Sequence, residues 1–185
     1  MSQDLRNMRV AVLATDGFEQ AELTEPVNAL RQNGAVVDII APQDGEIQGM
    51  QHHEKGDKFR VDRVLADTRP DEYAALVLPG GVANPDTLRI DKQAIAFIKH
   101  FVDAQKPIAA ICHGPWTLIE AGAVRGKRIT SWPSLQTDLR NAGADWVDEE
   151  VVVDQTLVTS RKPDDLPAFC AKLIEQLQSP QRAAA

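Results

Sequence analysis

The chain has 185 residues and a mass of 20.3 kDa, which is enough for one sizeable hydrophobic core and short for two domains of usual size. Its 20 Lys and Arg residues against 27 Asp and Glu residues give a formal net charge of −7. The few basic clusters are not interleaved with aromatic residues, which argues against a nucleic-acid partner. The sequence has neither an apolar span of roughly 20 residues nor a signal-type N-terminus, so we expect a soluble, cytoplasmic protein without a membrane partner.

Four short, largely apolar runs are typical of strands buried on both faces. They are residues 8–14, 35–42, 73–81 and 106–112. Helical signals separate them. Thr24 as a cap and Pro26 in the first turn predict a helix that ends at Asn33-Gly34, and Asp91 predicts the start of another that continues to residue 105.

The second half of the chain continues the alternation of strands and helices. The sequence predicts a helix over 115–122, a strand over 126–132, a helix over 134–143, a strand pair over 145–160 and a helix over 163–178. Asp154-Gln155 is the expected turn of the strand pair, and the tail 179–185 is expected to fray.

Alternating β and α units indicate a parallel sheet covered by helices on both faces. We therefore expect a three-layer αβα sandwich, flavodoxin-like in class, with a mainly parallel sheet and an added hairpin. Ligands of such folds bind at the carboxyl ends of the strands. Three segments fall at such ends: TDGFEQAE (15–22), PGGVANPD (79–86) and CHGPW (112–116).

Cys112 stands between a buried strand and a helix that starts at Gly114-Pro115, as the nucleophile of an elbow does. The helix N-terminus favours thiolate over thiol, so this placement predicts a lowered pKa for Cys112. His113 is a candidate general base or counter-ion, although neighbouring side chains on an extended backbone point to opposite faces. The alternative is that Cys112 is a small buried residue, as free cysteines commonly are.

The segments AAICHGPWTLIEAG, LVLPGG, DGFEQAEL and NAGADWVDEEVVVDQTLVTSRKPDDLPAF occur in an order that resembles the PfpI family of the ThiJ/PfpI superfamily, over residues 8–178. The resemblance implies one domain over 1–185 with a class I glutamine-amidotransferase-like core, and a homo-oligomer. It implies Cys112 as the nucleophile, His113 as its neighbouring histidine, and Glu19 as the acid beside the sulfur. A carboxyl group so close to a thiolate should have a raised pKa.

The resemblance also assigns the residues around the nucleophile. It implies that Gly80 and Gly81 supply N–H groups toward an oxyanion, and glycine does allow a backbone to approach a ligand closely. Asp86 aligns with a glutamate that orients the histidine of a neighbouring subunit in peptidase-like members, and aspartate is one methylene shorter. Trp116 either lines the mouth of the pocket or packs between helices.

Nothing in the sequence indicates a cofactor. His52-His53 lacks the spacing of a metal site and is expected in an exposed polar loop, while PGG lacks the lysine and glycine spacing of a nucleotide motif. The two cysteines lack CxxC spacing, so neither a disulfide framework nor a zinc site is expected. Cys170 is expected as a buried core cysteine within the last helix.

Three functions fit an activated thiol with an adjacent acid. The first is a stress-response enzyme that acts on α-oxoaldehydes or their protein adducts, a deglycase or glyoxalase-type reaction on a small carbonyl or glycated protein. The second is a cysteine peptidase of PfpI type, which depends on His113 and Asp86. The third is a redox-sensing or chaperone-like protein in which Cys112 is oxidised without turnover.

Overall fold

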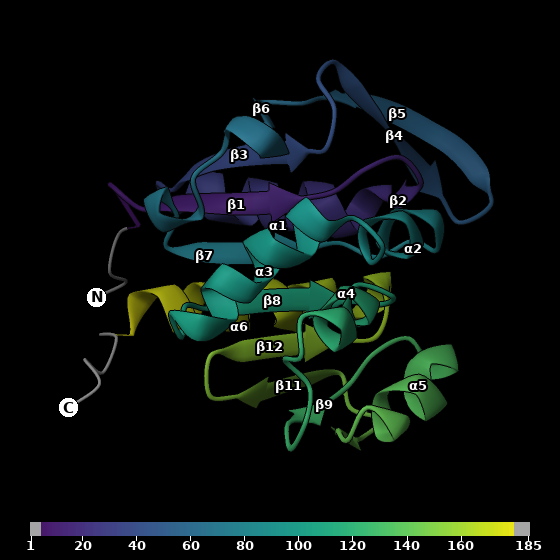
Figure 1. Cartoon of the computed structure of the whole chain (residues 1–185). Helices are drawn as coiled ribbons and strands as arrows, with labels where there is room; N and C mark the ends of the chain where they lie inside the picture. The colour runs from purple at the N-terminus through teal and green to yellow at the C-terminus, as the bar shows by residue number, and fades with distance from the viewer. Residues whose placement is uncertain (1–4, 180–185) are drawn as a thin grey trace.

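A seven-stranded sheet forms the centre of the computed structural model, which describes residues 5–179 (Figure 1). Its strands are β1 (Arg9–Leu13), β3 (Val36–Ala41), β6 (Arg63–Val64), β7 (Ala75–Leu78), β8 (Ile108–Ile111), β11 (Val151–Asp154) and β12 (Leu157–Ser160). The order is β11-β12-β8-β7-β1-β3-β6, and only β11 runs antiparallel to its neighbour. The carboxyl ends of β1, β7 and β8 therefore lie side by side at one edge.

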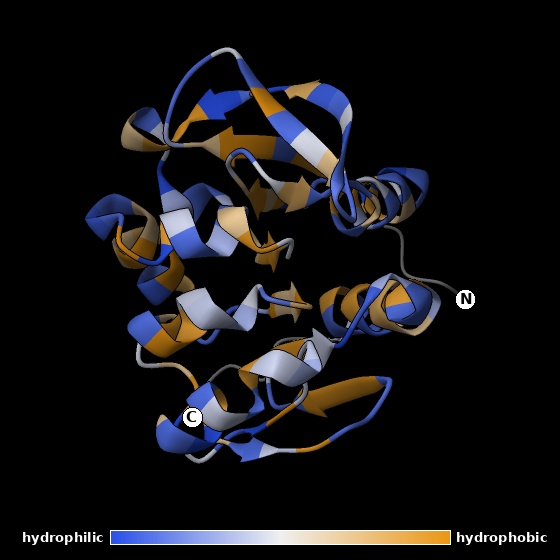
Figure 2. Ribbon diagram, turned by 90° about the vertical axis from the view of Figure 1, so that its right-hand side faces the viewer, coloured by the Kyte–Doolittle hydropathy of each residue, from blue (hydrophilic) through white to orange (hydrophobic). Residues whose placement is uncertain are grey.

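Helices cover both faces of this sheet, as Figure 2 shows from the carboxyl ends of the strands. One face carries α1 (Gln20–Gln32) and α6 (Leu166–Gln178), and the other carries α2 (Ala83–Leu88), α3 (Lys92–Asp103) and α4 (Pro115–Glu120). Within residues 5–179 the remaining helix is α5 (Gln136–Asn141), and four short 3-10 turns occur at Leu65–Asp67, Pro70–Glu72, Pro133–Leu135 and Pro163–Asp165. The predicted three-layer αβα sandwich is confirmed.

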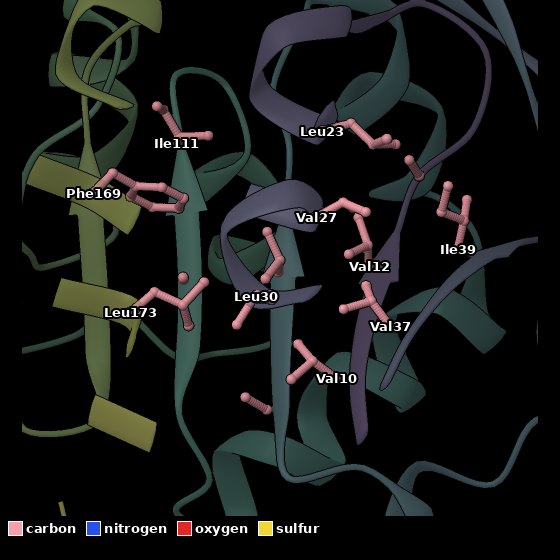
Figure 3. Close-up of a cluster of buried hydrophobic side chains, with 14 of the residues drawn as sticks. Val10, Val12, Leu23, Val27, Leu30, Val37, Ile39, Ile111, Phe169 and Leu173 are labelled. Atoms are coloured by element: carbon pink, nitrogen blue, oxygen red, sulfur yellow. The ribbon is translucent and has the colours of Figure 1, made fainter. Parts of the chain in front are cut away.

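The hydrophobic core has one layer on each face of the sheet because every central strand is apolar on both sides. On one face, alternate strand residues such as Val10, Val12 and Ile111 pack against α1 and α6 (Figure 3). On the other face, the intervening residues, Ala11 and Leu13 among them, pack against α3 and α4. The uninterrupted apolar runs of the sequence are thus shared between two cores.

Two smaller sheets stand beside the main one. The first has the order β2-β4-β5, with β2 (Phe18–Glu19), β4 (Glu46–Gln51) and β5 (Glu54–Arg60). The second pairs β9 (Arg128–Ile129) with β10 (Asp145–Trp146). The expected exposed polar position of His52-His53 is confirmed, since both residues form the exposed turn between β4 and β5, although the segments on either side of them are strands. The strand predicted at 126–132 is reduced to two residues outside the main sheet.

The helix boundaries agree with the sequence at α3 and differ at α1. The Asp91 carboxylate accepts hydrogen bonds from the N–H groups of Gln93 and Ala94, which confirms the predicted cap of α3. In contrast, α1 begins at Gln20, one turn before the predicted start at Thr24, so that Pro26 lies inside the helix. The turn between β11 and β12 lies where predicted, with Gln155 at a φ of 56°.

No helix of residues 5–179 is long and apolar enough to cross a membrane. The tail that we expected to fray lies outside the described residues from position 180 onward.

Replacement of Phe169 by Ala should destabilise the fold strongly. Phe169 is fully buried between α6 and the sheet (Figure 3), and truncating a buried Phe to Ala typically costs about 3–5 kcal/mol. Urea unfolding followed by circular dichroism measures the effect. Val153→Ala on the edge strand β11, where the side chain is 40% exposed, is the control and should change the free energy of unfolding by less than about 1 kcal/mol. Equal losses in the two variants would contradict this account of the core.

Candidate active site

Cys112 lies on a sharp turn between β8 and α4, in the left-handed backbone region with a φ of 61°. This conformation costs a residue with a side chain roughly 1–3 kcal/mol. Neighbouring segments hold it: the Cys112 N–H donates to the Ser160 carbonyl at 3.0 Å, and the Cys112 carbonyl accepts from the Trp132 N–H at 2.9 Å. The side chain is 7% exposed at the carboxyl edge of the sheet.

Glu22 is the acidic residue beside the Cys112 sulfur. It lies in the first turn of α1 and is completely buried. Its Oε2 accepts a hydrogen bond from the Gly80 N–H at 2.8 Å, and its carboxyl group interacts with the Cys112 thiol. Its Oε1 is also buried, and no protein donor within the described residues binds it. One carboxyl oxygen is therefore left for a proton or a ligand.

Glu19, which we expected beside the sulfur, lies elsewhere. Its Oε2 accepts a hydrogen bond from the backbone N–H of His52 at 3.0 Å and thereby ties α1 to the β4–β5 turn. Glu19 is the N-cap residue of α1, with an extended backbone, whereas Glu22 lies within the first turn of the helix. The buried positions Leu23, Pro26 and Val27 form a helical stripe, and extending that stripe back by one turn would have pointed to Glu22.

Gly80 and Gly81 lie close to both groups because they have no side chains. A Cβ on Gly80 would lie 2.6 Å from Glu22 Oε2 and 2.7 Å from Cys112 Cβ, so no larger residue fits. Gly81 has a φ of 74°, and a Cβ there would meet the Gly17 carbonyl at 2.3 Å. The Gly80 N–H is donated to Glu22, and so the expectation that it faces an oxyanion does not fit this geometry. The Gly81 N–H faces the Cys112 sulfur.

Burial controls the protonation of this pair. It raises the pKa of Glu22 from 4.5 to about 8, despite the opposing hydrogen bond from Gly80. Burial, together with the negative charge of Glu22, also raises the pKa of the Cys112 thiol, while the N–H groups of Gly81 and His113 lower it. The direction for Cys112 is opposite to the one predicted from the helix N-terminus, because α4 has only six residues and desolvation dominates.

His113 contacts the thiol directly, with 3.1 Å between its Nδ1 and Cys112 Sγ. The bent backbone brings the two neighbouring side chains together. The imidazole stacks on Trp132 at 6.0 Å between ring centroids and meets Trp116 edge-on at 5.2 Å. Its Nε2 lies 3.4 Å from Ser134 Oγ. Burial lowers the pKa of His113, so the neutral imidazole predominates at neutral pH.

Trp116 is half-buried and lies beside the site. Its Nε1 donates to Asp138 at 2.9 Å, and the Arg89 guanidinium lies over its ring. Asp86 is exposed on α2, and no interaction between its carboxylate and His113 occurs within the described part of this chain. The structure thus brings together Cys112, His113, Gly80, Gly81 and Trp116, and does not bring Glu19 or Asp86 to the sulfur.

Metal ligands do not gather anywhere in residues 5–179, where no group of three or more His, Cys, Asp or Glu side chains could hold an ion. The second thiol, Cys170, is half-buried on α6 against the core layer of α1.

The fold and this site define a class of protein: an αβα sandwich with a cysteine at a strand-to-helix turn, beside a buried acid from α1. Residues 8–176 match the DJ-1/PfpI family, and the chain belongs to this family. The resemblance seen in the sequence is confirmed.

Relatives and solved structures of this family cover nearly the whole chain. Protein/nucleic acid deglycase 2 of Escherichia coli (strain K12) is 44% identical over 87% of this chain and 92% of its own length. Putative cysteine protease YraA of Bacillus subtilis (strain 168) is also 44% identical, over 87% of this chain and 93% of that protein. The crystal structure of Drosophila melanogaster DJ-1beta matches with a TM-score of 0.85 at 27% identity, over 95% of this chain and 92% of that one.

Replacement of Glu22 by Gln should flatten the dependence of stability on pH. The pKa of Glu22 is higher in the folded state, at about 8, than its ordinary value of 4.5. The stability that its protonated form contributes is therefore complete below about pH 4.5 and is lost as the pH rises through about 8. Between these two pH values the free energy of unfolding of the native protein should fall by up to a few kcal/mol relative to that of Glu22→Gln, since one pKa unit corresponds to about 1.4 kcal/mol.

Urea unfolding at several values between pH 5 and pH 8 measures this difference. Glu19→Gln, which removes a carboxyl group from the same segment, is the control and should keep most of the native slope, because the charge of Glu19 raises the pKa of Glu22 less than burial does. Parallel curves for the native protein and Glu22→Gln would contradict the burial of a protonated carboxyl group at this position.

Proposed function

We propose that the protein is a cysteine-dependent enzyme that acts on α-oxoaldehydes, or on their adducts with protein amines and thiols, and releases a hydroxy acid. One observation carries the proposal: a fully buried carboxyl group with a pKa raised to about 8 lies beside the thiol of Cys112. A carboxyl group that keeps its proton near neutral pH can donate it to a carbonyl oxygen as the sulfur adds.

The proposed first step is addition of the Cys112 sulfur to the aldehyde carbon. The neutral imidazole of His113, 3.1 Å from the sulfur, accepts the thiol proton as the new C–S bond forms. The aldehyde oxygen takes a proton from Glu22, which gives a hemithioacetal. The positive-φ turn at Cys112 is the geometry of a nucleophile elbow and presents the sulfur at the edge of the sheet.

The second step moves a proton within the adduct. The hydrogen on the former aldehyde carbon leaves as a proton while the neighbouring ketone oxygen takes one, which gives an enediol. Return of a proton to the former ketone carbon, with loss of the proton from the hydroxyl of the former aldehyde carbon, gives the thioester of a 2-hydroxy acid. Glu22, deprotonated in the first step, is placed to carry this proton. Water then hydrolyses the thioester and restores the thiol, so that the sum of the reaction is α-oxoaldehyde plus water to hydroxy acid.

A peptidase of PfpI type is the second candidate, and the Cys112–His113 contact favours it. Peptide cleavage also requires His113 to give a proton to the amine leaving group. A residue hydrogen-bonded to the second nitrogen of the imidazole would assist this transfer. In this chain that neighbour is Ser134, whereas Asp86 would have to come from a second subunit. The peptidase therefore depends on a homo-oligomer, and the α-oxoaldehyde reaction does not.

Turnover of methylglyoxal, and of its adducts with N-acetylcysteine and N-acetyllysine, tests the first proposal. Native protein should form lactate, and Cys112→Ala should abolish it. Glu22→Gln should lower kcat by about 100-fold or more, as expected when a general acid is removed. Glu19→Gln is the matched control, because it changes a second glutamate three residues away and should retain activity within a few-fold of native.

Equal loss in the Glu19 and Glu22 variants would overturn the assignment of the acid. If no lactate forms and Cys112 is instead oxidised by mild peroxide, the redox-sensing role replaces the enzymatic one.

Casein and fluorogenic peptides, tested in parallel, address the peptidase. We expect no cleavage, and Asp86→Asn should leave lactate formation unchanged because the Asp86 carboxylate is exposed on α2. Cleavage of these peptides would contradict this expectation. If light scattering shows the protein to be an oligomer and Asp86→Asn lowers the cleavage rate about 100-fold, a cross-subunit triad is established.

A further inference from the structure

Asn84 is a buried polar residue next to the site that neither the sequence motifs nor the proposed reaction uses. It lies in α2, only 1% exposed, below the loop that follows β7. Its side-chain amide makes three hydrogen bonds to the backbone. Nδ2 donates to the carbonyls of Pro79 and Gly80, each at 3.1 Å, and Oδ1 accepts from the Thr15 N–H at 2.8 Å.

The two carbonyls that Asn84 binds belong to the two peptides that face the reacting groups. In a trans peptide the C=O points away from the N–H of the following residue, and the chain has no cis peptide among the described residues. The N–H opposite the Pro79 carbonyl is that of Gly80, which donates to Glu22 Oε2 at 2.8 Å. The N–H opposite the Gly80 carbonyl is that of Gly81, which faces the Cys112 sulfur.

We propose that Asn84 is a positioning residue that aims the Gly80 N–H at the acid and the Gly81 N–H at the nucleophile through a single side-chain amide. This role rests on the proposed function of Cys112 and Glu22. Hydrogen bonds in such chains polarise one another, so the two carbonyl contacts also strengthen the N–H donors on the other side of each peptide.

The chemistry of the position explains why it carries an asparagine. The loop after β7 offers two carbonyls, and the end of β1 offers one N–H, so the residue between them must donate twice and accept once in one plane. A carboxamide does this, whereas aspartate lacks the donors and serine lacks the reach and the planar geometry. Gly80 and Gly81 leave the loop free to adopt several backbone conformations. The hydrogen bonds of Asn84 hold it in the conformation that directs the two N–H groups at Glu22 and Cys112.

Asn84→Asp is the main test because it keeps the shape and the acceptor and removes only the two donors. We expect the variant to fold and to lose about 10- to 100-fold in kcat for methylglyoxal, the size expected when reacting groups shift by roughly 1 Å. KM should change by less than about 3-fold, since Asn84 does not touch the substrate. Asn84→Ser, whose hydroxyl is too short to reach both carbonyls, should lose a similar amount without placing a carboxyl group against them.

The second readout is the pH profile of Cys112 alkylation by iodoacetamide, with Cys112 and Cys170 separated by mass spectrometry. In both Asn84 variants the profile should move to higher pH than in the native protein, because the Gly81 N–H that stabilises the thiolate is no longer aimed at the sulfur. Asn33→Ala is the matched control. It removes another amide-to-carbonyl hydrogen bond, at 2.8 Å to Ala29 at the end of α1, and should lower stability without moving the profile.

A folded Asn84→Asp variant with the native kcat and the native alkylation profile would overturn the proposal and leave Asn84 a purely structural residue. The alkylation profile does not depend on turnover. If the native protein does not convert methylglyoxal, the proposed function fails while a shifted profile still supports the role of Asn84.

Discussion

The site is organised around one requirement, which is that a carboxyl group removed completely from water must find hydrogen-bond partners in the protein. Glu22 meets it through the Gly80 N–H, and that contact needs three other features. Helix α1 must begin early enough to place Glu22 in its first turn, residue 80 must lack a Cβ, and the Cys112 turn must approach the same point. A change in any one of these separates the acid from the thiol.

The order of the strands makes this convergence possible. β1, β7 and β8 are consecutive in the sheet, so the segments that follow them meet at one edge although they lie far apart in sequence. The first supplies Glu22, the second supplies the Gly80-Gly81 loop, and the third supplies Cys112. β12 completes the arrangement, because its last residue, Ser160, accepts the Cys112 N–H and holds the turn in its left-handed conformation.

The sequence predicted the sandwich well because buried parallel strands are uninterrupted apolar runs and because the Asp91 cap and the Asp154-Gln155 turn are strong local signals. The predictions from sequence failed where tertiary contacts determine the local structure. The start of α1 is set by the pairing of β2 with β4 rather than by a side-chain cap. The resemblance assigned the acid to Glu19, whereas the buried face of the first turn of α1 places Glu22 at the sulfur. The strand β5 is charged and largely exposed, so it has no hydrophobic pattern to recognise. The pKa of Cys112 depends on burial, which a local motif does not report.

The directions of the pKa shifts have a consequence for the kind of substrate. Burial keeps the Glu22 carboxyl and the Cys112 thiol protonated and the His113 imidazole neutral, so the three groups carry no net charge at neutral pH. Burial therefore favours the thiol over the thiolate at this site, and in the proposed reaction the sulfur loses its proton as it adds to the carbonyl. That behaviour supports the proposed reaction with small uncharged α-oxoaldehydes, whose carbonyl accepts the sulfur and takes a proton from Glu22 in the same step. Peptide cleavage asks more of the site, because His113 must deliver its proton to the amine leaving group, and the contact to its other nitrogen is a 3.4 Å approach of Ser134 Oγ rather than a carboxylate.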